Sequence, residues 1–228
     1  MELIAKPEHQ SHLDATDGMY PCEAHFWTES GTVGTRTGSI YGYCLEGRFI
    51  ISNSLDTFEI SEGNYFAMSG MVSFDDLEDN SKLWTVTRYG FKVPTQVGRV
   101  EKNGRLSYID GCSDSVLVSM PRYGDPVLNY LHFPEDIYQT QHTHPSVRLG
   151  VVISGEGTAF RDETAQSQSA WRKPLTKGCI FMLEEQELHS FCTDNSHMDI
   201  IAFHPDSDTG PTDENHSMIN RTYIDHGK

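Results

Sequence analysis

The sequence has no long apolar run and little positive charge. No hydrophobic stretch approaches the roughly 18 residues needed to cross a bilayer, and the start, MELIAKPEHQSHLDATDG, lacks the basic and apolar regions of a secretory signal. Lys and Arg number 17 against 33 Asp and Glu, which gives a formal net charge of −16. Because such a surface repels phosphate backbones and anionic lipids, we expect neither nucleic acid nor a membrane as a partner.

Cysteine motifs and helical periodicity are also missing. The five cysteines are odd in number and scattered, without a CxxC pair, so we expect neither a disulfide framework nor a cysteine zinc site, and the natural setting is a reducing cytoplasm. Short apolar runs such as RFIIS, LWTVTRYGF and LGVVISG recur instead. Gly, Pro, Asn or Asp interrupts them about every ten residues, and this pattern predicts an all-β fold.

An internal repeat divides the chain. YGYCLEG, which ends at Gly47, resembles LGVVISG, which ends at Gly155, and each copy has the pattern of a strand closing in a glycine turn. ISEGNYFAMSG resembles LTKGCIFMLEE, which aligns Gly63 with Gly178. The second copy has a polar insertion near FRDETAQSQSAWRKP, which is typical of a surface loop. Two tandem copies of one all-β unit are therefore predicted.

The expected boundaries follow from this repeat. Residues 1–17 form an N-terminal arm, 18–110 the first unit, 111–205 the second unit and 206–228 a polar tail rich in turn formers. Two units with exposed sheet edges often cover these edges by pairing, so a homodimer is a further expectation.

Three histidines of the second unit have the spacing of metal ligands. Residues i and i+2 of a strand point to one face, so the imidazoles of His142 and His144 can converge on one ion. His189 follows Gly178 by eleven residues. A strand pair that folds at Gly155 and returns after Gly178 brings His189 beside the other two. Neutral imidazole suits iron, zinc, copper and nickel.

These segments, HTHPSVRLGVVISGEG and GCIFMLEEQELHSF, resemble the two motifs of the cupin superfamily. The resemblance implies two tandem double-stranded β-helix (jelly-roll) barrels, with one mononuclear metal site in the second. Arg148 stands where the family has a glutamate ligand, and an arginine offers no lone pair to a metal. The implied site has three histidines and no protein carboxylate, similar to the gentisate and thiol dioxygenase types.

The residues around the motif carry further expectations. Arg148 should point into the barrel, where it either clamps a substrate carboxylate or forms a salt bridge with Glu187. Tyr138 shares strand parity with His142 and is predicted to line the cavity, whereas Gln139 should face away if the strand is regular. Glu187 shares parity with His189 and is a candidate acid–base group, a residue that orients a ligand, or a residue at the rim.

In the first copy, the positions aligned with the three histidines hold Gly34, Arg36 and Phe74, so this unit is predicted to be metal-free. His204 is expected at the surface or in a turn. Three functions stay open. The first is an Fe(II) dioxygenase acting on a small, anionic, carboxylated substrate. The second is an isomerase or lyase using Zn, Mn or Ni as a Lewis acid, and the third is a binding module without turnover.

Overall fold

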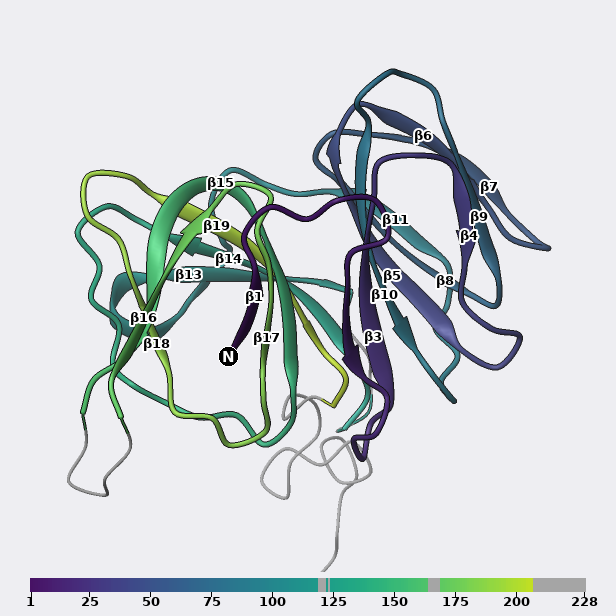
Figure 1. The fold of residues 1–228 in the computed structure, drawn as a ribbon. Coiled ribbons are helices and arrows are strands. Elements are labelled where there is room, and N and C mark those ends of the chain that lie inside the picture. The colour runs from purple at the N-terminus through teal and green to yellow at the C-terminus, as the bar shows by residue number, and fades with distance from the viewer. Residues whose placement is uncertain (119–121, 123, 164–168, 207–228) are drawn as a thin grey trace, which may run out of the picture.

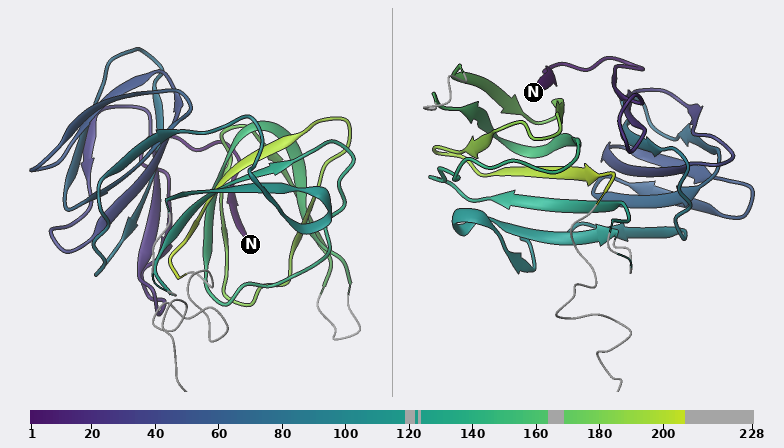
Figure 2. Two further views of the ribbon diagram at one scale, coloured as in Figure 1. Left: turned by 180° about the vertical axis from the view of Figure 1, so that it is seen from behind. Right: turned by 90° about the horizontal axis from the view of Figure 1, so that it is seen from below.

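The described part of the chain is all-β, with three sheets and one short 3₁₀ helix, η1 (Ile109–Gly111) (Figures 1 and 2). The computed structural model describes residues 1–118, 122, 124–163 and 169–206. Except for Asp206, the expected tail 206–228 lies outside these residues. None of the helices in the described ranges is long and apolar enough to span a membrane.

The six- and four-stranded sheets use residues 12–99, whereas the nine-stranded sheet uses residues 106–204 together with β1. The six-stranded sheet consists of β2 (His12–Ala15), β3 (Cys22–Trp27), β5 (Ser39–Glu46), β8 (Asn64–Ser69), β10 (Lys82–Arg88) and β11 (Gln96–Arg99). The four-stranded sheet consists of β4 (Gly31–Val33), β6 (Arg48–Ser52), β7 (Thr57–Ser61) and β9 (Val72–Asp76). The nine-stranded sheet consists of β1 (Glu2–Ile4), β12 (Leu106–Ser107), β13 (Ser113–Val118), β14 (Val127–Phe133), β15 (Arg148–Arg161), β16 (Trp171–Thr176), β17 (Ile180–Leu183), β18 (Ser190–Cys192) and β19 (Met198–His204). We call residues 12–99 the first half and residues 106–204 the second half.

The N-terminal segment reaches both halves. Strand β1 pairs antiparallel with β17 of the second half, and β2 pairs with β3 of the first. In Figure 1 the purple N-terminal strand lies against the green strands of the second half. Residues 1–17 thus add one edge strand to each of two sheets.

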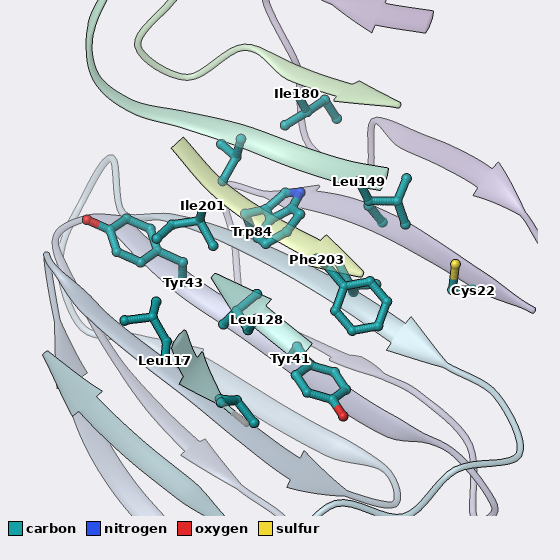
Figure 3. Packing of buried hydrophobic residues seen from close by; sticks show 14 of the residues in the cluster. Cys22, Tyr41, Tyr43, Trp84, Leu117, Leu128, Leu149, Ile180, Ile201 and Phe203 are labelled. Atoms are coloured by element: carbon teal, nitrogen blue, oxygen red, sulfur yellow. The ribbon is translucent and has the colours of Figure 1, made fainter. Parts of the chain in front are cut away.

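The six-stranded sheet is buried on both faces. Its central strand β5 is buried from Ser39 to Leu45, and alternate side chains enter two different cores. Ile40 and Cys44 pack against the four-stranded sheet, whereas Tyr41 and Tyr43 pack against the nine-stranded sheet. Figure 3 shows the second of these cores. Its side chains meet across the interface between the halves, and they include Tyr41, Tyr43, Trp84, Leu128, Leu149, Ile201 and Phe203.

The two halves share the local geometry of the sequence repeat. Gly42 of β5 lies opposite Phe66, and Gly150 of β15 lies opposite Phe181. At both glycines an added Cβ would lie 2.3 Å from the facing phenyl ring, so only glycine leaves room for the ring. These paired residues occupy matching places in the sequence repeat, so the two copies share this strand pairing.

Gly155 does not close a strand, in contrast to the sequence-based expectation. Strand β15 continues through it, pairing first with β17 and β19 and then with β16 and β18. Gly155 has a φ of +65°, and a Cβ there would lie 1.8 Å from the carbonyl oxygen of His197. Gly47, with φ of +73°, stands between β5 and β6 and passes the chain from the six-stranded to the four-stranded sheet. Both glycines adopt a positive φ, which lets one continuous stretch of chain pair with two different sets of strands.

Strand pairing also corrects the alignment at the ligand positions. Ile51, four residues past Gly47, pairs with Phe74, and Ala159, four residues past Gly155, pairs with Phe191. Phe74 therefore corresponds to Phe191, and the residue in the place of His189 is Val72. In the first half Val72 pairs with Val33, and both are buried in an apolar core.

The contact between Gly42 and Phe66 makes a stability prediction. The substitution G42A places a methyl group inside the van der Waals radius of the ring, so we expect a loss of about 1–3 kcal/mol in the free energy of unfolding. Urea denaturation of G18A is the matched control, because the nearest atom to a Cβ at Gly18 lies 3.4 Å away. Equal stability of the two variants would contradict this packing.

Candidate metal centre

The three histidines come together because two irregular segments pair between the strands. Backbone hydrogen bonds join His142 N to His189 O (2.9 Å) and His189 N to His142 O (3.0 Å), so these two residues form an antiparallel bridge. A second bridge joins Tyr138 to Cys192. Three residues lie between Tyr138 and His142, whereas two lie between His189 and Cys192. The first segment therefore contains one extra residue, as in a β-bulge.

The side chains of His142, His144 and His189 form a compact cluster. Their candidate ligand nitrogens all lie within 4.8 Å of one another, and the ring centroids are 4.6–5.0 Å apart. His189 is 1% exposed, and the other two are half-buried. This is the cluster predicted from the sequence, and the structure brings all three residues together.

Backbone carbonyls orient two of the rings. Nδ1 of His142 lies 2.8 Å from the carbonyl oxygen of Thr140, and Nδ1 of His189 lies 2.8 Å from that of Glu187. A carbonyl only accepts, so Nδ1 donates in each case and Nε2 keeps its lone pair. Nε2 of His189 is buried without a hydrogen-bond partner among the described residues. A metal ion in the cluster would satisfy this atom, so the residues fit a metal.

Burial and nearby positive charge favour the neutral form of the three histidines. Burial lowers the pKa of His189 to about 4, although its bond to the Glu187 carbonyl opposes the shift. Burial, followed by the positive charge of Arg148 and the neighbouring histidines, lowers the pKa of His144 to about 2. Burial also lowers the pKa of His142. Neutral imidazole is the ligating form, so protons compete weakly with a metal at neutral pH.

The cluster opens onto a cavity of about 300 Å³ inside the second half. Beside the three histidines, polar side chains on its wall include Asp114, Asn129, Gln139 and Arg148. Most of the remaining wall is apolar, with contributions from Leu106, Val116, Val127, Leu131, Phe133, Phe181, Leu183, Phe191, Ile200 and Ala202. A small molecule with few polar groups would fit this space.

Arg148 lines the cavity, as predicted. Its side chain is buried, and Nη1 donates to the carbonyl oxygen of Ser146 (3.0 Å), to Ser146 Oγ (2.7 Å) and to the carbonyl oxygen of Val147 (3.1 Å). Glu187, its proposed salt-bridge partner, instead accepts from the N-terminal ammonium of Met1 and from the backbone N–H of Glu184. Glu187 thus stands beside the site and holds the turn that precedes His189.

The prediction that Tyr138 lines the cavity is wrong. Its side chain is 57% exposed, and its hydroxyl donates to Asp162 (2.5 Å) on the outer surface. Gln139, expected to face away, is 1% exposed and lines the cavity. The extra residue between the two bridges reverses the alternation of side chains, so strand parity counted from His142 fails at Tyr138.

Sequence reasoning missed three cavity residues. His204 lies with its ring 6.2 Å from that of His144 and lines the cavity, and burial lowers its pKa well below the usual value. Asp114 and Asn129 also line the cavity, on adjacent strands β13 and β14. A polar residue at an inward position of an otherwise apolar strand, as in VLNYLHF, was the available signal.

Comparisons with known proteins give the fold. No family model matches the chain, and no curated protein matches it. The protein Ylba from E. coli superposes with a TM-score of 0.65 at 16% identity, over 89% of this chain and 84% of that one. A cupin 2 conserved barrel domain protein from Leptotrichia buccalis gives 0.62 at 17% identity, over 89% and 95%. A salicylate 1,2-dioxygenase from Pseudaminobacter salicylatoxidans gives 0.58 at 10% identity, over 80% and 70%. The chain thus shares the cupin fold with these structures.

The low pKa of His189 predicts a pH dependence of stability. An unfolded histidine gains its proton near pH 6.5, but the folded His189 gains it near pH 4. The metal-free protein should therefore have its full stability above pH 6.5 and lose up to about 1.4 kcal/mol per pH unit from this group as the pH falls toward 4. H189Q, measured by urea denaturation in parallel, should show a shallower decline. Parallel curves for the two proteins would refute the assignment.

Proposed function

We propose that the chain is a mononuclear metal-dependent protein of two tandem cupin barrels, of which the second holds one divalent ion on His142, His144 and His189. The orientation of the histidines carries the proposal, because two of the three Nδ1 atoms are held by carbonyls and a buried Nε2 has no partner in the described chain. The matched pairs of glycine and phenylalanine support the tandem arrangement. In the first barrel Val33 and Val72 replace a ligand pair.

We further propose an Fe(II)-dependent oxygenase that acts on a small carboxylated molecule. Three neutral ligands leave the full charge of the ion to attract an anionic substrate, and Arg148 adds a second positive charge beside it. A cavity of about 300 Å³ suits a small molecule. One structural neighbour is named as a dioxygenase of salicylate, itself a small carboxylate. Bound ferrous iron would supply the redox chemistry with dioxygen.

The protein's own residues do the binding and positioning. His142, His144 and His189 would hold the ion at the cavity wall. Arg148, held by the carbonyls of Ser146 and Val147, keeps its guanidinium at the wall without reorganisation when a carboxylate arrives. The phenyl groups of the wall exclude water from the reacting centre.

A non-redox role with Zn, Mn or Ni is the alternative, since neutral imidazoles also suit zinc and nickel. It needs an acid–base group within the cavity. Of the two residues expected to serve, Tyr138 lies on the surface and Glu187 is paired with the N-terminus. The oxygenase proposal needs no such group at these positions.

Metal content and oxygen consumption test the proposal. The purified protein should hold about one equivalent of metal, which H142A and H189A should lose. After anaerobic loading with Fe(II), the wild type should consume dioxygen with at least one member of a panel of small carboxylic acids, phenols and thiols. Tight zinc with no oxygen uptake across the panel would favour the alternative, and metal retained by both variants would disprove the site.

The role of Arg148 makes a separate prediction. For the substrate found in that panel, R148M should raise KM about tenfold or more, because the charge-assisted bonds to the carboxylate are lost. R172M is the matched control, since Arg172 lies on the surface near Tyr138 and Asp162. An unchanged KM in R148M, with metal content intact, would exclude the clamp.

A further inference from the structure

The cavity has a second polar region, on strands β13 and β14. Asp114 and Asn129 are 9% and 8% exposed, and Asn129 Nδ2 donates to Asp114 Oδ2. This bond fixes the amide, because a carboxylate accepts and so draws the NH₂ group toward itself. Oδ1 of Asn129 is then left buried, with no hydrogen-bond partner among the described residues.

The buried side-chain atoms of this region that lack a partner among the described residues are acceptors. Oε1 of Gln139, which lines the same cavity, is also buried without a partner in the part of the chain that the structure describes. Asp114 forms no ion pair with a described Lys, Arg or His, and burial raises its pKa. Buried acceptors without donors cost free energy, which a donor brought by a ligand would recover.

The acceptors lie at a distance from the positive end of the cavity. Asn129 lies opposite Ala202 of β19, and Ala202 lies opposite Gly150 of β15, two residues from Arg148. Two strand spacings, about 10 Å, therefore separate the backbone of Asn129 from the strand that carries Arg148. Ala202 lines the cavity between them with a methyl group only. A ligand can therefore bridge the two ends.

We propose that the substrate is an amino-carboxylate, whose ammonium group binds Asp114 and Asn129 while its carboxylate faces Arg148 and the metal. This specificity rests on the proposed function, which supplies the carboxylate end. An ammonium group beside Asp114 stabilises the charged carboxylate, so this region favours ammonium over a neutral hydroxyl or amide, because the charge-assisted bond is the stronger one. Both ends of the ligand are then neutralised inside a cavity that is otherwise mostly apolar.

Calorimetric titration of the Zn(II)-loaded protein tests this inference without turnover. The probes are γ-aminobutyrate and ε-aminocaproate, each compared with the acid that lacks the amine, butyrate or caproate. In these probes the amine is too far from the carboxylate to chelate the ion with it. At least one amino acid should bind about tenfold or more tightly than its partner acid. Equal affinities within both pairs would overturn the inference.

Substitutions at Asp114 and Asn129 test whether these residues cause the preference for the amino acid. D114N keeps the shape of the side chain and removes its charge, so the preference for the amino acid should fall to about twofold or less while the affinity for butyrate or caproate is unchanged. D79N, on an exposed turn of the first half, should keep the wild-type preference. If D114N does not fold, N129L serves for the same comparison. A preference that survives in the folded variant would overturn the role of this region.

If the proposed metal-dependent function is wrong, the experiments give a different result. The protein then does not bind zinc through its histidines, or the plain acids bind R148M as tightly as the wild type. Loss of the amine preference with zinc and acid binding intact would count against the amino-carboxylate alone.

Discussion

The need to bury both faces of the six-stranded sheet organises the rest of the molecule. Its strands β5 and β10 are buried along nearly their whole length, so one face requires the four-stranded sheet and the other requires the second half. The second half meets this face with Leu128, Leu149, Ile201 and Phe203. Since side chains alternate along a strand, the residues between them must point the other way.

That alternation determines which side chains line the cavity. Asn129 follows Leu128, Arg148 precedes Leu149, and Ala202 and His204 flank Phe203. These inward residues line the metal cavity, while their neighbours hold the sheet against the first half. The packing between the halves therefore supports the site directly, because a slip of one residue in any of these strands would exchange a core residue for a cavity residue.

The sequence was informative where the chemical type of a residue and the regular alternation of side chains along a strand led to the same prediction. The spacing of His142, His144 and His189, the all-β pattern and the inward direction of Arg148 were all predictable, because each depends on residue type and regular alternation. The exposed position of Tyr138 was not predictable, because nothing in the sequence reveals the extra residue between Tyr138 and His142. The alignment of Phe74 was two residues off for a similar reason, because the chain from Gly63 to Phe74 is two residues shorter than the chain from Gly178 to Phe191.

A comparison of the two halves shows which buried groups the second half has in place of an apolar core. The first half fills its interior with Trp27, Phe49, Phe66 and Phe74 and pairs Val33 with Val72 where the second half pairs His142 with His189. The first half is therefore built around a mostly apolar core.

The second half instead keeps three desolvated imidazoles, a buried guanidinium and a buried carboxylate around open space. Each of these groups lowers stability unless something binds it. Folding alone does not account for such a set, because the first half folds around an apolar core without it. The groups have complementary chemistry: lone pairs at the histidines, a positive charge at Arg148, and acceptors at Asp114 and Asn129. One metal ion and one ligand charged at both ends would complement all of them together.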